Sequence, residues 1–449
     1  MKVLLISPAF DGFARGIPLG LGYLGAILEE NNFETRIIDI ASQNISNFEF
    51  KQLLEDYKPN LIGITSTGAN YLNAIEAISI SKKILGKDVK MVLGGPHASF
   101  GAETILLNHL EIDFCVIGEG ELTFLNLVKY LDKPIGDLSS IKGIAYLRNN
   151  KVVFTEPQIK IRNLDFLPYP TRHLYDYQDF PSTICENIVS SNSNTELMAS
   201  RGCLYSCDFC STKKHWGNYR KHSTPRVISE LKDLISLGYS GFYFNDDIFT
   251  IDRNWVIDLC ESIISIGIPI TWSCGTRVDR IDLEMLTKMK TAGCKYIYFG
   301  VESGNNYIIQ NQRKGTTLRQ VELAYELMKE VGIYSACALV FGLPGETIET
   351  AKNTVDWVRD KIQPNELWIS KACCYPGTGL ANYYGITSID YESKINNRSK
   401  NGLIYGSSGI YTPFFNKREP VSELWNYIKS ELGNRELLFA DEIDIYEND

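Results

Sequence analysis

The sequence lacks the features that mark membrane-spanning, secreted and nucleic-acid-binding proteins. No apolar run approaches the ~20 residues of a transmembrane helix, and the first run is too short for a signal peptide and is broken by Pro8. Lys and Arg total 45 against 54 Asp and Glu, the formal net charge is −9, and no long basic run occurs. We therefore expect a cytoplasmic protein with no membrane span and no nucleic-acid partner.

Cysteine is not scarce, but its distribution gives no sign of a disulfide framework. Most of the 11 cysteines are scattered singly or stand side by side as Cys373-Cys374, a pattern that fits a reducing compartment. The adjacent pair would point to opposite faces of a strand, and small buried residues are its simplest interpretation. A chain of 449 residues exceeds one hydrophobic core, so two or three domains are expected.

Three cysteines do gather, in the stretch Ser200-Arg201-Gly202-Cys203-Leu204-Tyr205-Ser206-Cys207-Asp208-Phe209-Cys210. Thiolates are soft ligands that suit iron–sulfur clusters, and a four-iron cluster normally takes four of them. Three cysteines on one loop would leave one iron open to another ligand, and Gly202 would allow the tight turn. The pair Cys207 and Cys210 alone could be a redox disulfide or half of a zinc site. No second ligand pair follows, however, and a redox pair leaves Cys203 unexplained.

Residues 1–131 alternate short apolar runs with segments of helical spacing, which predicts a parallel sheet covered by helices on both faces. Ligands of such sheets bind at the carboxyl ends of the strands. The strand ends carry four loops of small and polar residues: Ser7-Pro8, Thr65-Ser66-Thr67, Gly94-Gly95-Pro96-His97 and Gly118-Glu119-Gly120-Glu121. Any one of them could be plain turn chemistry, but four on one edge predict a ligand site.

Residues 132–195 are predicted to connect two halves, with a hairpin over Gly143–Glu156 that turns at Asn149-Asn150 and a polar loop at Asn187–Asn194. The strand-and-helix rhythm resumes over 196–377 and predicts a six-stranded partial barrel of the TIM type. The expected strands are Glu196–Ala199, Gly241–Asn245, Ile270–Cys274, Tyr296–Val301, Ala336–Phe341 and Glu366–Ala372. Residues 378–449 form a small C-terminal segment that either caps the barrel bottom or walls the substrate site.

With these motifs in view, the stretch 200–210 resembles the cluster loop of the radical S-adenosylmethionine (SAM) superfamily, in which an aromatic residue such as Phe209 precedes the third cysteine. The resemblance implies a [4Fe–4S] cluster on Cys203, Cys207 and Cys210 whose open iron binds SAM, and reductive cleavage of SAM to a 5′-deoxyadenosyl radical. It also implies SAM contacts at the ends of the later barrel strands. These are Asn245, Asp246 and Asp247 at the amino group, Arg277 at the carboxylate unless it is a surface charge, Glu302 and Ser303 at the ribose, and Gly342, Leu343 and Pro344 at the adenine.

The first half resembles the cobalamin-binding domain that precedes the barrel in the B12-dependent subfamily. Gly94–His97 and Gly118–Glu121 match that domain's strand-end sequences, and the resemblance implies a Rossmann-like domain whose strand-end loops bind cobalamin. The Asp-x-His-x-x-Gly signature that supplies a cobalt ligand in other B12 domains is absent. Cobalt is therefore expected to lack a protein histidine, and His97 is expected in a loop near the corrin edge.

Together the resemblances imply a cobalamin-dependent radical SAM enzyme that methylates carbon or phosphorus of a small-molecule or natural-product substrate. An electron donor such as flavodoxin or ferredoxin is implied, and no protein general acid or base is identified. Two alternatives stay open: a radical cyclase or rearrangement enzyme of the same architecture, such as one closing a tetrapyrrole ring, and a corrinoid- or cluster-binding sensor without turnover. A tRNA methylthiotransferase is disfavoured by the acidic charge and by the lack of a second cysteine set.

Overall fold

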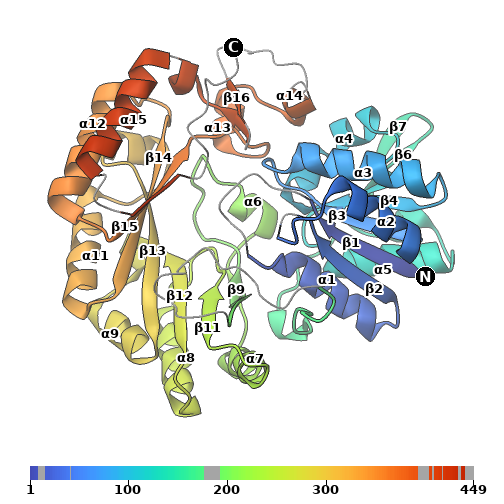
Figure 1. Ribbon diagram of the computed structural model, residues 1–449, viewed down its shortest axis with the longest axis horizontal. Helices are drawn as coiled ribbons and strands as arrows, with labels where there is room; N and C mark the ends of the chain where they lie inside the picture. The colour runs from blue at the N-terminus through green and yellow to red at the C-terminus, as the bar shows by residue number, and fades with distance from the viewer. Residues whose placement is uncertain are drawn as a thin grey trace.

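The computed structural model describes residues 1–8, 16–40, 42–175, 193–392, 404–406, 409–416, 418–432 and 436–439. The expected loop after the first strand, Ala9–Gly12, lies outside these residues, as do most of the polar loop Asn187–Asn194 and part of the C-terminal segment. Two seven-stranded sheets dominate the structure, one in each half of the chain. Figure 1 shows them side by side, with the N-terminal half in blue to teal and the barrel in green to red.

The first sheet has the order β2-β1-β3-β4-β5-β6-β7, and β1 to β5 run parallel as the apolar runs predicted. Its parallel strands are β1 (Lys2–Ser7), β2 (Glu34–Asp39), β3 (Leu61–Thr65), β4 (Lys90–Gly94) and β5 (Phe114–Val116). Its helices are α1 (Leu19–Glu30), α2 (Asn47–Tyr57), α3 (Tyr71–Leu85), α4 (Gly95–Asn108) and α5 (Glu121–Asp132).

The helices cover both faces of this sheet because the strands are apolar on both faces. Alternate residues of β1 belong to different cores: Leu4 and Ile6 pack in the same cluster as Phe50 of α2, whereas Val3 and Leu5 pack in a second cluster on the opposite face. This two-residue periodicity is that of a strand buried on both sides. The first sheet is therefore covered by helices on both faces.

The hairpin predicted over Gly143–Glu156 is present as β6 (Ile144–Arg148) and β7 (Lys151–Phe154). Asn149 and Asn150 both have positive φ, +50° and +57°, as the favoured two-residue hairpin turn requires. The hairpin was expected within the connecting segment, but β6 pairs antiparallel with β5 and so extends the first sheet. Local pattern predicted the hairpin and could not predict the strand with which it pairs.

The second sheet is entirely parallel, in the order β18-β15-β14-β13-β12-β11-β8, and curves into the predicted partial barrel. Its strands are β8 (Asn194–Leu197), β11 (Gly241–Phe244), β12 (Thr271–Thr276), β13 (Cys294–Glu302), β14 (Tyr334–Phe341), β15 (Glu366–Lys371) and β18 (Glu436–Phe439). The outer helices are α7 (Thr224–Ser236), α8 (Arg253–Ile266), α9 (Leu283–Thr291), α11 (Leu318–Val331), α12 (Ile348–Trp357) and α15 (Arg418–Leu432). The six expected strands are confirmed, and β18 is an addition from the C-terminal segment.

Shorter elements fill the space between the two sheets and around the barrel mouth. They are β9 (Ser200–Arg201) with β10 (Arg220–Lys221), α6 (Thr212–Trp216), α10 (Asn306–Asn311), α13 (Gly379–Tyr383), α14 (Ser388–Glu392) and the hairpin β16 (Ile404–Gly406) with β17 (Gly409–Tyr411). Figure 1 shows α6 between the two halves.

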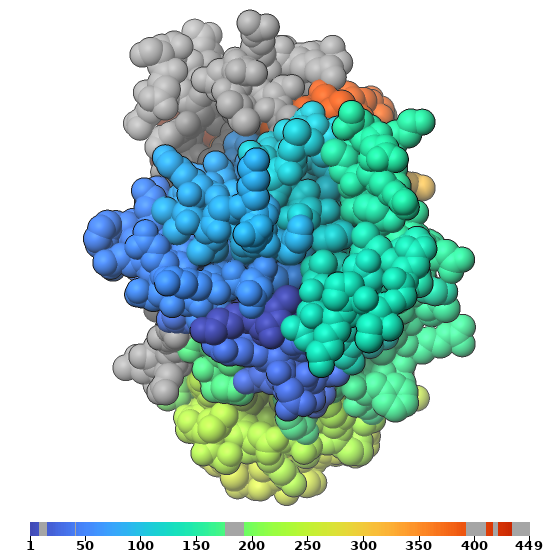
Figure 2. Space-filling view, turned by 90° about the vertical axis from the view of Figure 1, so that its right-hand side faces the viewer, coloured from blue at the N-terminus to red at the C-terminus, as the bar shows by residue number. Residues whose placement is uncertain are grey.

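The described part of the C-terminal segment joins the two domains. Leu380 and Tyr391 are buried in the same apolar cluster as the residues around α4, and Ser388 Oγ donates to Thr104 Oγ1 at 3.0 Å. Seen from the N-terminal side in Figure 2, blue-to-teal residues of the first domain make most of the visible face, with barrel residues emerging below. No helix in the described ranges combines the length and apolarity that crossing a bilayer requires.

Candidate active site between the two sheets

The cysteine loop follows β8 at the carboxyl end of the barrel strands, between β9 and α6. Cys203 is buried, Cys207 is half-buried and Cys210 is exposed. Gly202 has φ +87°, and a Cβ there would lie 2.6 and 2.8 Å from the carbonyl oxygens of Asn218 and Gly217. Only glycine adopts this positive φ without strain and has no Cβ to clash with these oxygens. The turn that leads into the first cysteine therefore depends on Gly202.

The surroundings of the thiols fit an iron–sulfur cluster. Backbone N–H groups of Tyr205 and Thr212 donate to the Sγ atoms of Cys203 and Cys210, each at 3.4 Å, and such donors favour thiolate ligands. Burial raises the pKa of Cys207, while nearby Lys314 and Arg277 act in the opposite direction. In the described ranges no three His, Cys, Asp or Glu side chains gather around a single ion position. A four-iron cluster does not need its ligands to converge on one position, because each cysteine binds a different iron.

The side chains of Asn245, Asp246 and Asp247, which follow β11, all bond to the strand and loop that carry the cysteines. Asn245 Nδ2 donates to Glu196 Oε2 at 2.8 Å. Asp246 is buried and accepts from the Ala199 N–H at 3.1 Å and from the Ser200 hydroxyl. Burial raises the pKa of Asp246 to about 7, partly offset by these hydrogen bonds. In this structure, these three side chains therefore position the cysteine loop.

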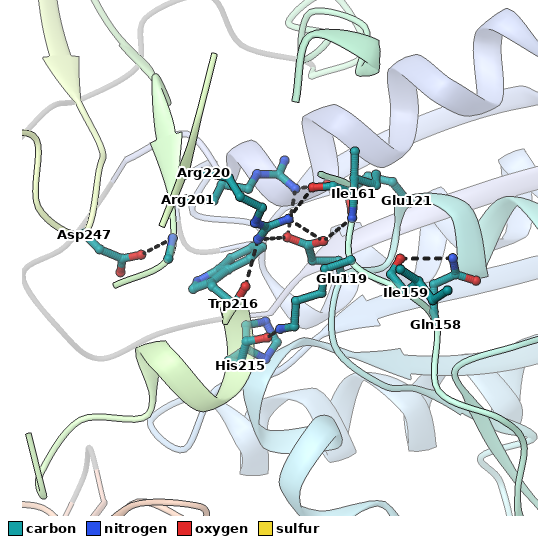
Figure 3. A network of polar contacts seen from close by, with 12 residues as sticks. Glu119, Glu121, Gln158, Ile159, Ile161, Arg201, His215, Trp216, Arg220 and Asp247 are labelled. Atoms are coloured by element: carbon teal, nitrogen blue, oxygen red, sulfur yellow. Dashed lines mark hydrogen bonds and ion pairs between the residues drawn. The ribbon is translucent and has the colours of Figure 1, made fainter. Parts of the chain in front are cut away.

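Asp247 ties the two ends of the cysteine loop to β11. Its Oδ2 accepts from the Gly202 N–H at 3.0 Å, which Figure 3 draws, and its Oδ1 accepts from the Thr212 hydroxyl at 3.2 Å. One carboxylate thus binds residues on both sides of the three cysteines in the sequence.

Arg277 is buried rather than a surface charge, with 4 % of its surface exposed. Its guanidinium donates to both carboxylate oxygens of Asp279, at 2.9 and 3.1 Å, and to the Lys314 carbonyl at 2.9 Å. It also stacks 3.5 Å from the ring centroid of Tyr205 in the cysteine loop. The two guanidinium N–H groups that were expected to bind a SAM carboxylate therefore bind the carboxylate of Asp279 in this structure.

Glu302 ends β13 in a strained conformation. Its φ is +71°, a region that non-glycine residues rarely adopt and that is concentrated at functional sites, and the pairing with β14 shifts register between Gly300 and Glu302. The Lys314 ammonium donates to Glu302 Oε1 at 2.6 Å, and both side chains are buried. Sequence reasoning missed Lys314, because nothing in its local pattern shows that it returns to the end of β13.

Ser303 and the loop after β14 make hydrogen bonds that stabilise local turns. Ser303 Oγ accepts from the Asn305 N–H at 3.2 Å. Gly342 has φ +87°, its carbonyl accepts from the Thr412 hydroxyl at 2.6 Å, and its N–H donates to Glu346. Leu343 is buried in the cluster shared with the first domain, and Pro344 is half-buried beside it.

A cavity of about 150 Å³ opens at the carboxyl end of the first sheet. Seven of the predicted residues line it: Thr65, Gly94, Gly95, Gly118, Glu119, Gly120 and Glu121. Apolar side chains of α1 and α5, including Leu24 and Phe124, form further walls. His215 and Trp216 of α6 enter the lining from the barrel side, and sequence reasoning did not foresee them.

The other predicted residues of this domain do not line the cavity. Ser7, Pro8 and Ser66 lie near the strand ends without reaching it, and Thr67 bonds through its N–H to Asn70 Oδ1 at 2.7 Å. His97 was expected in a loop, and this was wrong. It lies in the first turn of α4, where Pro96 sits at a favoured helix-start position.

His97 is buried in the core, with its ring stacked 4.1 Å from that of Tyr71 and edge-on to Tyr391 at 5.2 Å. Burial lowers the pKa of His97 to about 3, and neither ring nitrogen has a hydrogen-bond partner.

Buried ion pairs join the two domains beside the cavity (Figure 3). Arg201 Nη1 lies 2.6 Å from Glu121 Oε1 and 3.9 Å from Glu119 Oε1. Arg220 donates to both Glu119 oxygens, at 3.0 and 2.5 Å, and to the Ile161 carbonyl at 2.7 Å. Arg201 also lies over the rings of Tyr23 and Trp216, at 4.6 and 5.2 Å. The predicted loop glutamates therefore bind arginines of the barrel half.

Known proteins match both halves of the chain. The B12 binding domain family matches residues 2–128 and the radical SAM superfamily matches residues 197–358. An uncharacterized methyltransferase of Pyrococcus horikoshii is 32% identical over 391 residues, which cover 85% of this chain and 83% of that protein. An anaerobic magnesium-protoporphyrin IX monomethyl ester cyclase of Rubrivivax gelatinosus is 29% identical over 80% of this chain and 66% of that protein.

Among solved structures, the radical SAM methyltransferase TsrM from Kitasatospora setae, with cobalamin and a [4Fe–4S] cluster bound, shares the fold. Its TM-score is 0.77 at 18% identity, over 97% of this chain and 92% of that one.

The fold and the two family matches define an enzyme in which a B12-binding domain precedes a radical SAM barrel. The chain belongs to the cobalamin-dependent radical SAM enzyme family, as the motifs predicted. The cofactors of this enzyme are a [4Fe–4S] cluster, SAM and cobalamin.

Proposed function

We propose that this enzyme transfers a methyl group to an unactivated carbon or phosphorus of a small-molecule or natural-product substrate. The observation that carries the proposal is the buried ion pair between Glu121, beside the first-domain cavity, and Arg201, two residues before the first cysteine. It holds the predicted methyl-donor site against the predicted radical-generating site. When bound, the cluster and SAM supply a hydrogen-abstracting radical, and cobalamin supplies the methyl group. The similarity to a methyltransferase over 85% of the chain supports this choice.

In this proposal Cys203, Cys207 and Cys210 hold the cluster, and Phe209 packs beside it with the Lys314 ammonium 5.8 Å from its ring centroid. Cys210 is exposed, so an electron donor such as flavodoxin or ferredoxin could reduce the cluster from that side.

SAM is proposed to lie at the barrel mouth, between the cysteine loop and the ends of β13 and β14. Glu302 is the proposed ribose contact, because it is a buried carboxylate in a strained conformation at the end of β13, where the pairing with β14 shifts register. Arg277, Ser303 and Gly342–Pro344 are proposed to shape the same site. Asn245, Asp246 and Asp247 contribute by fixing the cysteine loop, so the SAM amino group would meet the backbone of these residues.

The first-domain cavity is proposed to take the nucleotide end of cobalamin. A cavity of about 150 Å³ with apolar walls accepts one small aromatic ring system, whereas a corrin macrocycle is far too large for it. Gly95 has φ +90°, and a Cβ there would lie 2.6 Å from the Ser66 carbonyl oxygen, so the strand-end loops could not pack this closely with a larger residue. The corrin would then rest on the strand ends that face the barrel.

The substrate is proposed to enter the barrel interior, where aromatic side chains line the concave face. Ile297 and Phe299 of β13 belong to the core beneath the outer helices. Tyr296 and Tyr298 alternate with them and lie in a separate cluster on the opposite face of β13. Trp368 of β15 donates to the Tyr296 hydroxyl at 3.0 Å and meets the Tyr298 ring edge-on at 5.7 Å. Tyr298 and Trp368 are half-buried, and these surfaces suit a substrate with an apolar or planar part.

The test uses anaerobically reconstituted enzyme, a reductant, candidate small molecules and SAM with an isotopically labelled methyl group. Label in a product that has gained one methylene would support methyl transfer. A product without the added methylene would favour the cyclase or rearrangement alternative. The similarity to the Rubrivivax cyclase supports that alternative. Failure to consume SAM with any substrate would favour a sensor.

A further inference from the structure

His215 is a histidine of the barrel half that lines the cavity of the other domain. It lies on α6, five residues after Cys210 in the sequence, and it is 6 % exposed. The cavity wall that it forms with Trp216 faces Gly118–Glu121 and the start of α4. Figure 3 shows His215 below the ion-pair network and Trp216 beside it, where the Trp216 carbonyl accepts from Arg220.

The ring of His215 has a polar atom without a partner. Its Nδ1 is buried and makes no hydrogen bond, although a buried polar group is normally satisfied. The remaining contacts are aromatic: the ring lies edge-on to Trp216 at 4.8 Å and to Phe100 at 6.3 Å. The backbone carbonyl of His215 is engaged separately, by the Lys160 ammonium.

His215 carries no charge near neutral pH. Burial, reinforced by the nearby Lys160 charge, lowers its pKa to about 4, against the opposing effect of Glu121. A neutral imidazole has one donor and one acceptor nitrogen, so it suits a neutral polar group. A neutral polar group placed against this wall would meet the imidazole without bringing a charge into the cavity.

We propose that His215 hydrogen-bonds the nucleotide end of cobalamin and is thus a cofactor-binding residue supplied by the radical SAM barrel. This inference rests on the proposed function, in which that end of the cofactor fills the cavity. Its consequence is that α6 connects the cluster loop directly to cobalamin.

The test compares two corrinoids, cobalamin and cobinamide, which lacks the nucleotide. His215→Phe keeps an aromatic ring against Trp216 and Phe100 and removes the hydrogen bond. Binding is followed by anaerobic absorbance titration in the dark. We expect the variant to bind cobalamin roughly three- to tenfold more weakly, the value of one hydrogen bond, and to bind cobinamide as the wild type does.

His97→Phe is the matched control, because His97 is equally buried and unpartnered but lies outside the cavity. It should bind both corrinoids normally. Iron content and the unfolding midpoint establish that each variant is folded.

Unchanged cobalamin affinity in folded His215→Phe would overturn the inference, and so would an equal loss for cobinamide. Nitrogen superhyperfine splitting in the electron paramagnetic resonance spectrum of bound cob(II)alamin, lost in His215→Phe, would also overturn it in favour of coordination to cobalt. Wild-type protein that binds neither corrinoid would instead overturn the proposed cobalamin site itself.

Discussion

Arg201 and Glu121 form a buried ion pair, with Nη1 and Oε1 2.6 Å apart, between residues that are 80 positions apart in the sequence. Arg201 belongs to β9, immediately before the turn into the first cysteine, and Glu121 begins α5 of the B12-binding domain. Each side chain is at most 5 % exposed. Buried pairs of this kind add little net stability but strongly penalise the loss of one partner, so this pair specifies how the domains meet.

Removing one partner of that pair should loosen the domain contact. Glu121→Gln leaves the Arg201 guanidinium with only the more distant Glu119, and we expect the free energy of unfolding to fall by about 3 kcal/mol. Anaerobic denaturant titration measures the change. Arg253→Gln, which breaks exposed pairs with Asp282 and Glu284, is the control and should change little. An equally small effect of Glu121→Gln would contradict the assigned role.

The cluster should depend on three thiols together. Replacing Cys203, Cys207 and Cys210 with Ala is expected to abolish both the iron–sulfur absorbance and SAM cleavage, because these thiolates bind the irons. Cys260→Ala removes a thiol buried in the barrel core and should keep full iron content. Retention of about four irons per chain in the triple variant would show that the cluster lies elsewhere.

Glu302 should order SAM rather than take part in bond cleavage. Glu302→Gln is expected to weaken SAM binding roughly ten- to a hundredfold, the value of a charge-assisted hydrogen bond, with iron content unchanged. Equilibrium binding of SAM to the reconstituted protein checks this. Lys314→Met separates two explanations: it removes the partner of Glu302 but should weaken SAM binding less than Glu302→Gln does. Equal losses would mean that the pair as a whole shapes the site.

Asp246 should make the fold less stable as pH rises. Its carboxyl has an ordinary pKa of 3.8 when unfolded and about 7 when folded, so the folded state holds the proton more tightly. Stability from this group is therefore complete below about pH 4 and declines between about pH 4 and 7, by on the order of 4 kcal/mol at most. Asp246→Asn should flatten the dependence of unfolding free energy on pH between 4 and 7. The same slope in the variant would assign it to other groups.

No protein histidine should coordinate cobalt. His97 is stacked on Tyr71 within the domain core, and the loop after β1 contains no histidine. The electron paramagnetic resonance spectrum of protein loaded with cob(II)alamin should therefore lack nitrogen splitting from an axial protein ligand. Splitting that disappears in His97→Phe would contradict this placement.

The sequence was most informative where chemistry or periodicity is local. The parallel strands followed from apolar runs, and the cysteine loop followed from three thiols at short spacing. The sequence could not show where distant side chains meet. Lys314 reaches Glu302 across a turn and a short helix, and His215 lines a cavity built by another domain.

The same limit explains the misplaced elements. β18 is four residues long and is separated from β15, the strand that it joins, by α13, α14, the β16–β17 hairpin and α15, so no local pattern marks it. His97 follows Gly-Gly-Pro, which reads locally as a loop, yet the packing of α4 against Tyr71 makes this proline a helix start.

The single carboxylate of Asp247 has a consequence for how the enzyme matures. Because it anchors Gly202 at one end of the cysteine loop and Thr212 at the other, these hydrogen bonds would draw the ends of the loop together as the barrel folds. The entropy of gathering the thiols is then lost during folding of the barrel rather than during metal binding. We expect cluster insertion to be a late event on an already shaped protein, and chelation of iron to leave a folded chain that can be filled again.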